Sequence, residues 1–277
     1  MGTSPDESKK NLISKAAELA ASRKGTGGPP PELARQFLEY YYRHVADEDL
    51  SGRSEVDVYG AAVSQYKLAA ERPQGKANIR AFTPSVSEHG WSADGHTVVE
   101  VVTDDMPFLV DSITMELVNQ QRDIHLVIHP QLDVERDITG DLLALRPDDG
   151  VGEAPPETIR ESWMHIEIDR VPDTEDTAAI EADLQRVLRD VREAVEDWDR
   201  MHAQVLRIIA DLETDPPPLP AGEIEQGRNL LQWLADGHFT FLGYREYRLE
   251  GSGEDEALRA VPGTGYGILR ADQDLSQ

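Results

Sequence analysis

The sequence predicts an α+β fold in successive parts: a helical N-terminal arm at 1–75, an antiparallel sheet domain at 76–215 and the start of a second α+β unit at 216–277. Apolar residues recur every three to four positions throughout the arm, as in amphipathic helices. A β-branched run starts at Thr97, and the later patterns follow the order strand, helix, strand, strand, helix. That order is typical of a ferredoxin-like sandwich, in which both helices cover one face of the sheet.

The N-terminal arm is expected to contain helices at 12–23, 31–45 and 55–71. The first ends before a glycine- and proline-rich segment, and Pro31 suits the first turn of the second. The second helix carries an apolar and aromatic stripe: Leu33, Phe37, Tyr40, Tyr41 and His44. Such a stripe is more often core than docking surface, so packing is predicted and docking is the alternative.

The sheet domain opens with strands at 78–82 and 97–103, where the apolar period changes to two. Asp104 and Asp105 then precede Pro107, a pattern that suits a helix N-cap followed by a first-turn proline. Helix capping is therefore predicted for both aspartates. An acid and base pair is the alternative, but no apolar pocket or titratable partner is visible beside them.

The helix is expected to run to about Gln121 and to lead into a strand at 124–134. The polar segment 137–157 reads as a long loop or insertion, and a strand at 163–169 closes a long-armed hairpin. A ferredoxin-like sheet needs a fourth strand, which is missing at its usual place. The strand at 78–82, which precedes the unit, is predicted to fill that edge.

A long helical pattern covers 176–212 and stops at a run of prolines. An unbroken helix there would be ~55 Å long at ~1.5 Å per residue, which is longer than a small sheet can cover. The far half is therefore expected to project or to break near Asp199. A further helix at 224–235 is closed by Gly237, and a strand follows that reaches Leu249.

Polar residues alternate with apolar ones on the two hairpin strands: His125, His129, His165, Glu167 and Asp169. They predict a polar sheet face that is open to solvent or paired with another subunit. The opposite face would meet the helices through Ile124, Leu126, Ile128, Met164, Ile166 and Ile168. A metal site is the alternative. His125 and His129 would stand ~13 Å apart on one strand, so only His129 with His165 is left to share an ion.

Composition excludes several classes of function. The chain has 27 Lys plus Arg against 53 Asp plus Glu, a net charge of -26, which predicts no nucleic-acid or anionic-membrane partner. A solvated acidic surface explains this charge better than recruitment of basic partners or cations. The absence of cysteine excludes disulfides, thiolate metal sites and cysteine nucleophiles. The polar N-terminus and the lack of a long apolar segment predict a cytoplasmic location.

A nicotinamide cofactor would normally sit on a G-x-G-x-x-G turn between a strand and a helix. The glycines of 263–267 (GTGYG) have the wrong spacing and are predicted to form a loop. Neither a cofactor site nor a catalytic residue is therefore expected in this chain.

Blocks at 104–112 (DDMPFLVDS), 123–130 (DIHLVIHP), 161–169 (ESWMHIEID) and 230–247 resemble the N-terminal region of the large NAD-specific glutamate dehydrogenase family. They occur in the same order over about 76–270. The resemblance implies a homo-oligomeric enzyme that oxidatively deaminates L-glutamate to 2-oxoglutarate and ammonia, with NAD bound by a more C-terminal catalytic region. It also implies an ACT-like domain here, a module that binds amino acids or pairs sheets between subunits.

The same resemblance points to the first strand-to-helix turn as an effector or interface site: Asp104, Asp105, Met106, Phe108, Leu109, Asp111 and Ser112. Effector-binding ACT turns carry glycine where Phe108 stands, which favours a structural or intersubunit role. The expected partners are the protein's own catalytic region, other subunits and a small amino-acid effector. A stand-alone amino-acid-sensing module is the alternative.

Overall fold

The computed structural model describes residues 5–22, 27–147, 158–251 and 256–271. The chain forms two compact units, Met1–Leu188 and Arg189–Gln277, which are considered separately below. The domain boundaries expected after residues 75 and 215 stay predictions. Within the described segments, no helix is both long and apolar enough to span a membrane.

The Met1–Leu188 unit begins with helices α1 (Pro5–Ser22), α2 (Pro31–Tyr41) and α3 (Glu55–Leu68), with a short 3-10 turn η1 (Glu48–Leu50) between the last two. Ser54 caps α3 by accepting a hydrogen bond from the amide of Asp57.

The aromatic stripe of α2 is core, as predicted. Phe37 and Tyr41 are at most 2% exposed and pack in one hydrophobic cluster with Trp163 of the sheet. Leu33 and His44, at the ends of the expected stripe, are exposed instead.

A single sheet follows, and all of its strand pairs are antiparallel. Its strands are β1 (Asn78–Phe82), β2 (Thr97–Asp104), β3 (Ile124–Ile128), β4 (Gln131–Arg136), β5 (Leu142–Pro147) and β6 (Ile159–Ile168). The order is β1-β2-β6-β4-β5, with β3 also paired to β6. A short helix α4 (Val86–His89) lies between β1 and β2. Strand β1 fills the edge beside β2, as predicted.

Strand β5 lies within the segment 137–157, for which a long loop or an insertion is predicted, and corrects the loop alternative. It pairs with β4 from Leu132↔Pro147 to Arg136↔Leu142. The two strands form a local hairpin through 137–141, and β5 contains a short apolar run, LLAL, within the otherwise polar segment. The rest of the predicted loop, 148–157, lies outside the described residues.

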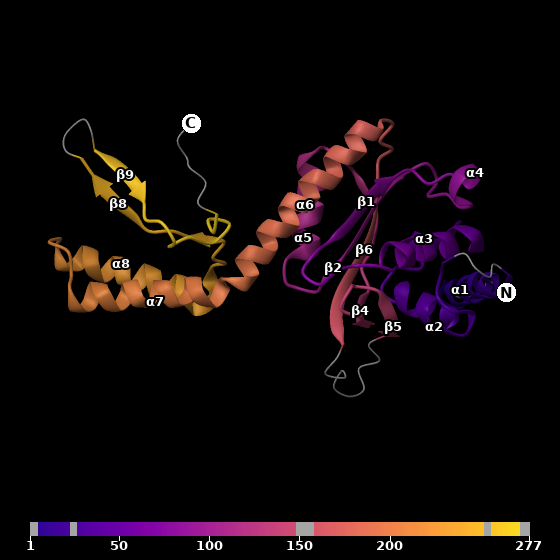
Figure 1. Ribbon diagram of the computed structural model, residues 1–277, viewed down its shortest axis with the longest axis horizontal. Coiled ribbons are helices and arrows are strands. Elements are labelled where there is room, and N and C mark those ends of the chain that lie inside the picture. The colour runs from indigo at the N-terminus through magenta and orange to yellow at the C-terminus, as the bar shows by residue number, and fades with distance from the viewer. Residues whose placement is uncertain (1–4, 23–26, 148–157, 252–255, 272–277) are drawn as a thin grey trace. The chain divides into compact units, whose positions relative to one another are not determined.

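Helices cover both faces of this sheet. Helix α5 (Leu109–Asn119) and the first part of α6 (Thr174–Glu196) lie on one face, and α1, α2 and α3 lie on the other (Figure 1). The face under α5 and α6 is apolar, with fully buried residues from strands and helices: Val99, Val101, Met164, Ile166, Ile113, Leu117 and Leu184. The prediction that the polar face is open to solvent or to another subunit is therefore wrong for His165 and Glu167, which the N-terminal helices cover, whereas His125 and Asp169 keep exposed side chains.

A β-bulge in β3 changes which side chains face which layer. The register shifts between Ile124 and Leu126, so that Leu126 lies opposite Glu167 and Ile128 lies opposite His165. Both residues belong to the cluster formed with the N-terminal helices. The expectation that they share a face with Ile166 is wrong, since a bulge reverses the alternation beyond it.

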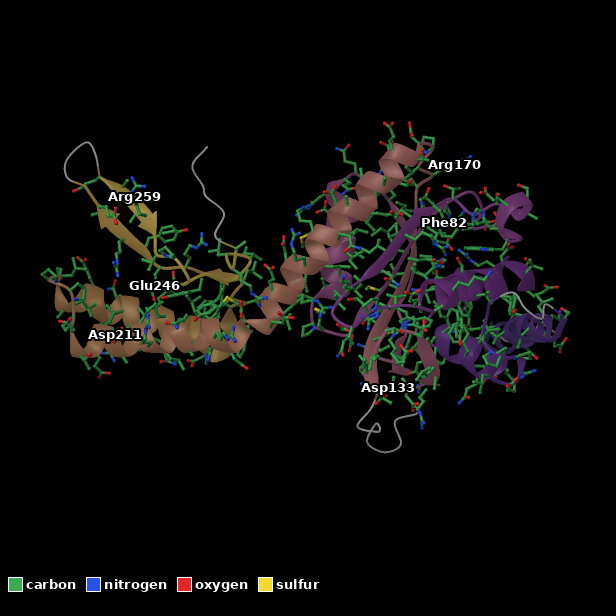
Figure 2. The ribbon with its side chains drawn as sticks, in the orientation of Figure 1. Phe82, Asp133, Arg170, Asp211, Glu246 and Arg259 are labelled. Carbon is green, nitrogen blue, oxygen red and sulfur yellow. The ribbon has the colours of Figure 1, made fainter. Side chains whose placement is uncertain are left out.

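The Arg189–Gln277 unit begins within α6 and contains the break between α6 and α7 (Trp198–Thr214), which falls at Asp197 beside the predicted position. Helix α8 (Ala221–Trp233) ends in a π turn, Leu234–His238, where Gly237 adopts a φ of 86°. Strand β7 (Gly243–Tyr244) pairs with β10 (Tyr266–Gly267), and β8 (Tyr247–Glu250) pairs with β9 (Ala257–Ala260). The carboxylate of Glu246, labelled in Figure 2, accepts a hydrogen bond from Arg207 of α7 at 2.7 Å.

Candidate functional site

The predicted turn connects the end of β2 at Asp104 with the start of α5 at Leu109. Phe108 lies directly before the helix with φ 71° and ψ 2°, which is the left-handed region. Its ring is 49% exposed. A bulky residue rarely adopts this conformation, which costs about 1–3 kcal/mol. The backbone of the turn therefore keeps the glycine-like conformation although the residue is phenylalanine.

The helix-capping prediction for Asp104 and Asp105 is wrong. Helix α5 begins after Phe108, and no side chain caps it. Asp104 accepts hydrogen bonds from Arg72 at 2.7 Å and from the amide of Gly75 at 3.0 Å. Asp105 accepts from Ser162 at 2.5 Å and from Gln131 at 3.1 Å.

The two aspartates thus tie the turn to the sheet rather than to the helix. Arginine, serine and amide donors from neighbouring strands and loops take the carboxylate oxygens that a cap would use.

The remaining predicted site residues divide between core and surface. Leu109 is 2% exposed and anchors the start of α5. Asp111 is exposed in the first turn of the helix, where a negative charge is favourable. The amide of Ser112 donates to the carbonyl of Phe108, and Met106 is half-buried. Phe108 and Asp111 are the members of the set that a ligand or a second protein would meet first.

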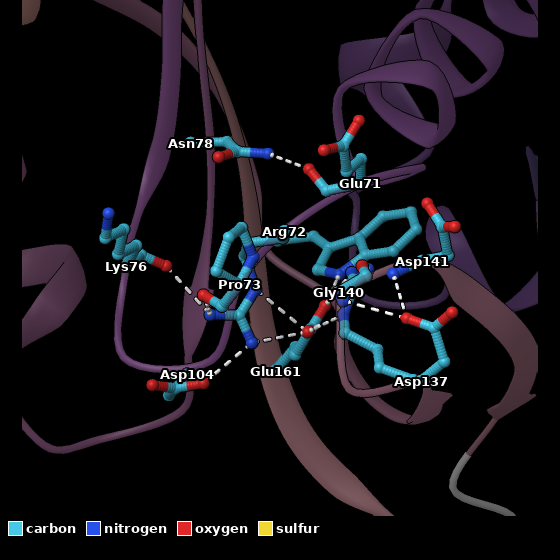
Figure 3. Close-up of polar contacts among 12 residues, drawn as sticks. Glu71, Arg72, Pro73, Lys76, Asn78, Asp104, Asp137, Gly140, Asp141 and Glu161 are labelled. Atoms are coloured by element: carbon cyan, nitrogen blue, oxygen red, sulfur yellow. Dashed lines mark hydrogen bonds and ion pairs between the residues drawn. The ribbon is translucent and has the colours of Figure 1, made fainter.

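Behind the turn lies a buried ion cluster centred on Glu161 of β6 (Figure 3). Arg72 donates to Glu161 Oε1 from Nε at 2.9 Å and from Nη2 at 2.5 Å. Arg136 of β4 donates to both carboxylate oxygens at 2.6 and 2.9 Å. The indole of Trp163 adds a bond of 2.9 Å to Oε2. Glu161 and Arg72 are fully buried, so their charges balance each other away from water.

Gly140 allows the β4–β5 turn to reach this cluster. Its carbonyl accepts from the amide of Arg72 at 2.9 Å and from Arg136 at 2.8 Å. A Cβ at Gly140 would lie 2.6 Å from the carbonyl carbon of Arg72, and the φ of Gly140 is +102°. Only glycine fits this close approach.

A second buried cluster lies further along β6, around Glu167. Arg53 binds Glu167 with two hydrogen bonds of 2.6 and 2.7 Å, and His165 approaches the same carboxylate at 3.4 Å. Burial alone would raise the pKa of Glu167, but His165 and Arg53 outweigh it and lower that pKa to about 2.

Glu100 of β2 completes this second cluster from the neighbouring strand. It pairs with Arg80 at 2.5 Å and is fully buried. The carboxylates of both clusters are thus held by arginines, which suits a structural role better than proton transfer.

Gln65 of α3 fastens the helical layer to the sheet between these clusters. Its amide nitrogen donates to the carbonyls of Val101 at 3.1 Å and Met164 at 2.8 Å. Its carbonyl oxygen accepts from the hydroxyl of Tyr41 at 2.5 Å. Burial raises the pKa of Tyr41 well above its ordinary value, so its hydroxyl stays a donor.

The predicted histidines do not converge. His125 bonds Asp169 at 2.9 Å and stacks on His96 with ring centroids 4.2 Å apart. His129 bonds Ser162, whose side chain lies on the opposite face of β6 from that of His165. A metal ion shared by His129 and His165 is therefore ruled out by geometry. Among the described side chains, no group of three or more His, Asp or Glu could hold a metal.

Sequence reasoning missed the arginines that neutralise the buried carboxylates, Arg53, Arg72, Arg80 and Arg136. One usable signal was present: Glu100 is a lone charge inside the β-branched run of β2. An acidic residue in such a buried strand needs a cationic partner. The identity of the partner was hidden, since Arg72 and Glu161 are separated by 89 positions in the sequence.

Comparison with known proteins supplies a family. A family model described as "Glutamate dehydrogenase, ACT1 domain" matches residues 37–184. The chain is 36% identical over 242 residues to the NAD-specific glutamate dehydrogenase of Halomonas elongata, which covers 86% of this chain and 14% of the relative. It is 34% identical over 211 residues to the same-named protein of Pseudomonas aeruginosa, covering 76% of this chain and 13% of the relative. It is 26% identical over 208 residues to the same-named protein of Mycobacterium tuberculosis, covering 75% of this chain and 12% of the relative. The chain therefore spans about one-seventh of the length of these relatives.

Proposed function

The chain belongs to the glutamate dehydrogenase ACT1 family and corresponds to the N-terminal region of the large NAD-specific glutamate dehydrogenases, and from this premise we propose a regulatory and assembly role without catalysis. The whole protein would oxidise L-glutamate, with NAD and water, to 2-oxoglutarate, ammonia and NADH. NAD and the catalytic residues would belong to other parts of that protein. The partners of this segment would be those parts and the same segment of other subunits.

The observation that carries the assembly role is the outer edge of β3. Among the described residues, β3 pairs only with β6. Its sequence, Ile-His-Leu-Val-Ile, contains no lysine or proline, the residues that usually protect a free strand edge. By contrast, on edge strand β1 the amide of Ala81 is taken by Glu181 of α6. Apart from the bulge at His125, the apolar β3 edge carries no such protection, which favours pairing with the same strand of a second subunit.

Cross-linking tests this proposal directly, because the chain contains no cysteine. His125 is exposed on β3, where it pairs with Asp169 and stacks on His96 at the surface. In a two-fold β3–β3 pairing whose axis passes at residue 125, a His125→Cys variant would bring two thiols within disulfide range, about 4–7 Å between Cα atoms. We expect a covalent dimer on mild oxidation. Val86→Cys, exposed on α4, is the matched control and should stay monomeric on a denaturing gel.

The non-catalytic part of the proposal has its own test. The purified chain is expected to show no glutamate-dependent reduction of NAD. Dehydrogenase activity that copurifies with the chain through two separate columns would contradict it.

A second candidate function, binding of an amino-acid effector, is favoured by the left-handed Phe108. The backbone of the turn already has the conformation that a glycine would give, and the amides at the start of α5 can receive a carboxylate. We expect the exposed Phe108 ring to block the approach of a ligand to these amides. Calorimetry with L-amino acids should therefore show weak or no binding to the wild-type chain and stronger binding to Phe108→Gly. Heat changes absent from both proteins would exclude this candidate.

A further inference from the structure

A small pocket lies where β3 ends and β4 begins, beside the C-terminal end of α2. Its volume is about 360 Å³. The residues that line it are Tyr41, His44, Val45, Val127, His129, Pro130 and Gln131. None of them is used by the ion clusters around Glu161 and Glu167, and none belongs to the predicted turn. The pocket is large enough for a small molecule of a few heavy atoms.

A hydrogen-bond chain fixes the tautomer of His129, which faces this pocket. Ser162 donates its single hydroxyl proton to Asp105 Oδ1 at 2.5 Å. The same Ser162 oxygen lies 3.0 Å from His129 Nε2. Because the serine proton is already committed to the carboxylate, Nε2 must donate. The proton of the neutral ring is therefore on Nε2, and Nδ1 carries a lone pair.

The ring is neutral at ordinary pH. Burial lowers the pKa of His129, and the Asp105 carboxylate opposes that effect only in part. Among the described residues, His129 Nδ1 makes no hydrogen bond. This nitrogen is thus an acceptor that a ligand can use.

Another polar group at the mouth of the pocket is also an acceptor. Gln131 spends its amide nitrogen on both oxygens of Asp105 at 3.1 Å, which leaves its carbonyl oxygen without a described partner. The hydroxyl of Tyr41 is committed to Gln65. Val45, Val127 and Pro130 supply apolar walls.

These features select a ligand with hydrogen-bond donors and a short aliphatic body. No lysine or arginine is among the residues that line the pocket, so a carboxylate would find no permanently charged cationic partner. The negative charge of Asp105, one hydrogen-bonded residue away through Ser162 or Gln131, favours a cation. We propose that this pocket binds a small primary amine in its ammonium form, with His129 Nδ1 as the principal acceptor.

The occupied pocket would also act on the predicted turn. His129 and Gln131 both reach Asp105, directly or through Ser162, and Asp105 lies within the turn before α5. A ligand that donates a hydrogen bond to His129 Nδ1 would strengthen the hydrogen bond from His129 Nε2 to Ser162. The stronger chain of hydrogen bonds would hold Asp105 in place. The proposal stands independently of the regulatory role inferred above, since it needs only the pocket and the hydrogen-bond chain.

The test uses the chain labelled with ¹⁵N-histidine and titrated with n-butylammonium chloride. Long-range ¹H–¹⁵N spectra should first show an unprotonated Nδ1 and a protonated Nε2 for His129. Titration should then shift the Nδ1 resonance saturably. Norvaline, a zwitterion of similar length, and butanol should bind at least about tenfold more weakly, a difference of about 1.4 kcal/mol. His129→Phe should abolish the response, whereas His125→Phe, a histidine outside the pocket, should retain it.

Three results would overturn the proposal. A His129 ring protonated on Nδ1 in the wild-type chain would refute the hydrogen-bond argument without any variant. A shift that rises linearly with butylammonium, or one equally strong with norvaline, would refute the assigned ligand class. If His129→Phe fails to fold, His129→Asn and the wild-type tautomer measurement decide the question.

Discussion

The two helical layers of the Met1–Leu188 unit are attached to the same sheet by different forces. Under α5 and α6, the strands present valine, isoleucine and methionine, and the contact is apolar. Under α1, α2 and α3, the same strands present Glu100, Glu161 and Glu167, each fully buried and each held by arginine. The comparison shows that a polar stripe on a strand does not imply exposure to solvent. It also predicts that the two layers respond differently to mutation and to pH.

The largest expected effect is on the charged layer. Glu161→Ala would leave Arg72 and Arg136 buried without their carboxylate, which should lower the free energy of unfolding by about 3–5 kcal/mol. Urea denaturation measures this loss of unfolding free energy. Hydrogen exchange of the β6 amides identifies the Met1–Leu188 unit as the part that is destabilised. Glu135→Ala, which removes a surface pair with Arg146, is the control and should cost less than about 1 kcal/mol. Equal losses in the two variants would show that burial of the cluster has no energetic consequence.

The second-largest effect is expected from acidification, which should destabilise the charged layer. The pKa of Glu167 is lowered from its ordinary value of 4.5 to about 2, so its stabilisation is present above pH 4.5 and is lost as the pH falls towards 2. The depression corresponds to about 3 kcal/mol. Between these pH values, wild-type protein should lose that much more stability than Glu167→Gln. Parallel stability curves for the two proteins would mean that Glu167 is not ionised in its arginine pair.

On the apolar layer, a small truncation should have a modest effect that does not depend on pH. Ile166→Val removes one methylene from a fully buried side chain and should cost about 0.5–1.5 kcal/mol. Its stability difference from wild type should be the same at pH 7 and pH 3, because the residues paired beside Ile166, Val99 and Val127, do not titrate. A difference that grows on acidification would show that the layers are coupled.

The smallest effect is expected at the turn. Phe108→Gly relieves the left-handed strain but makes the unfolded chain more flexible, for a net gain of up to about 1 kcal/mol in unfolding free energy. Phe108→Ala keeps the strain and loses the ring, so it should be less stable than Phe108→Gly. The reverse order in urea denaturation would mean that ring packing outweighs backbone strain.

The sequence was sufficient for those parts of the fold that depend on local pattern. The β-branched run of β2, the helix after it and the break beside Asp199 are encoded in short windows. Even the position of β1 at the open edge followed from the known element order of a ferredoxin-like sheet.

Most of the missed features depend on contacts between distant segments. Arg72 is buried because Glu161 lies beside it in space. Strand β5 is the exception, because it forms a local hairpin with β4 and contains a short apolar run at 142–145. The bulge at His125 reversed the face of Leu126 and Ile128, and nothing in the alternation of those residues marks it. The capping interpretation of Asp104 failed for the same reason, since its arginine partner is 32 positions away.

The measurement that tests the central proposal most directly is the molar mass of the purified chain by light scattering, with and without added L-amino acids. An assembly role through the β3 edge predicts at least a dimer over a range of concentrations, and a mass change with one amino acid would add effector sensing. A monomer at every concentration, unaffected by any amino acid, would contradict both the assembly and the regulatory role.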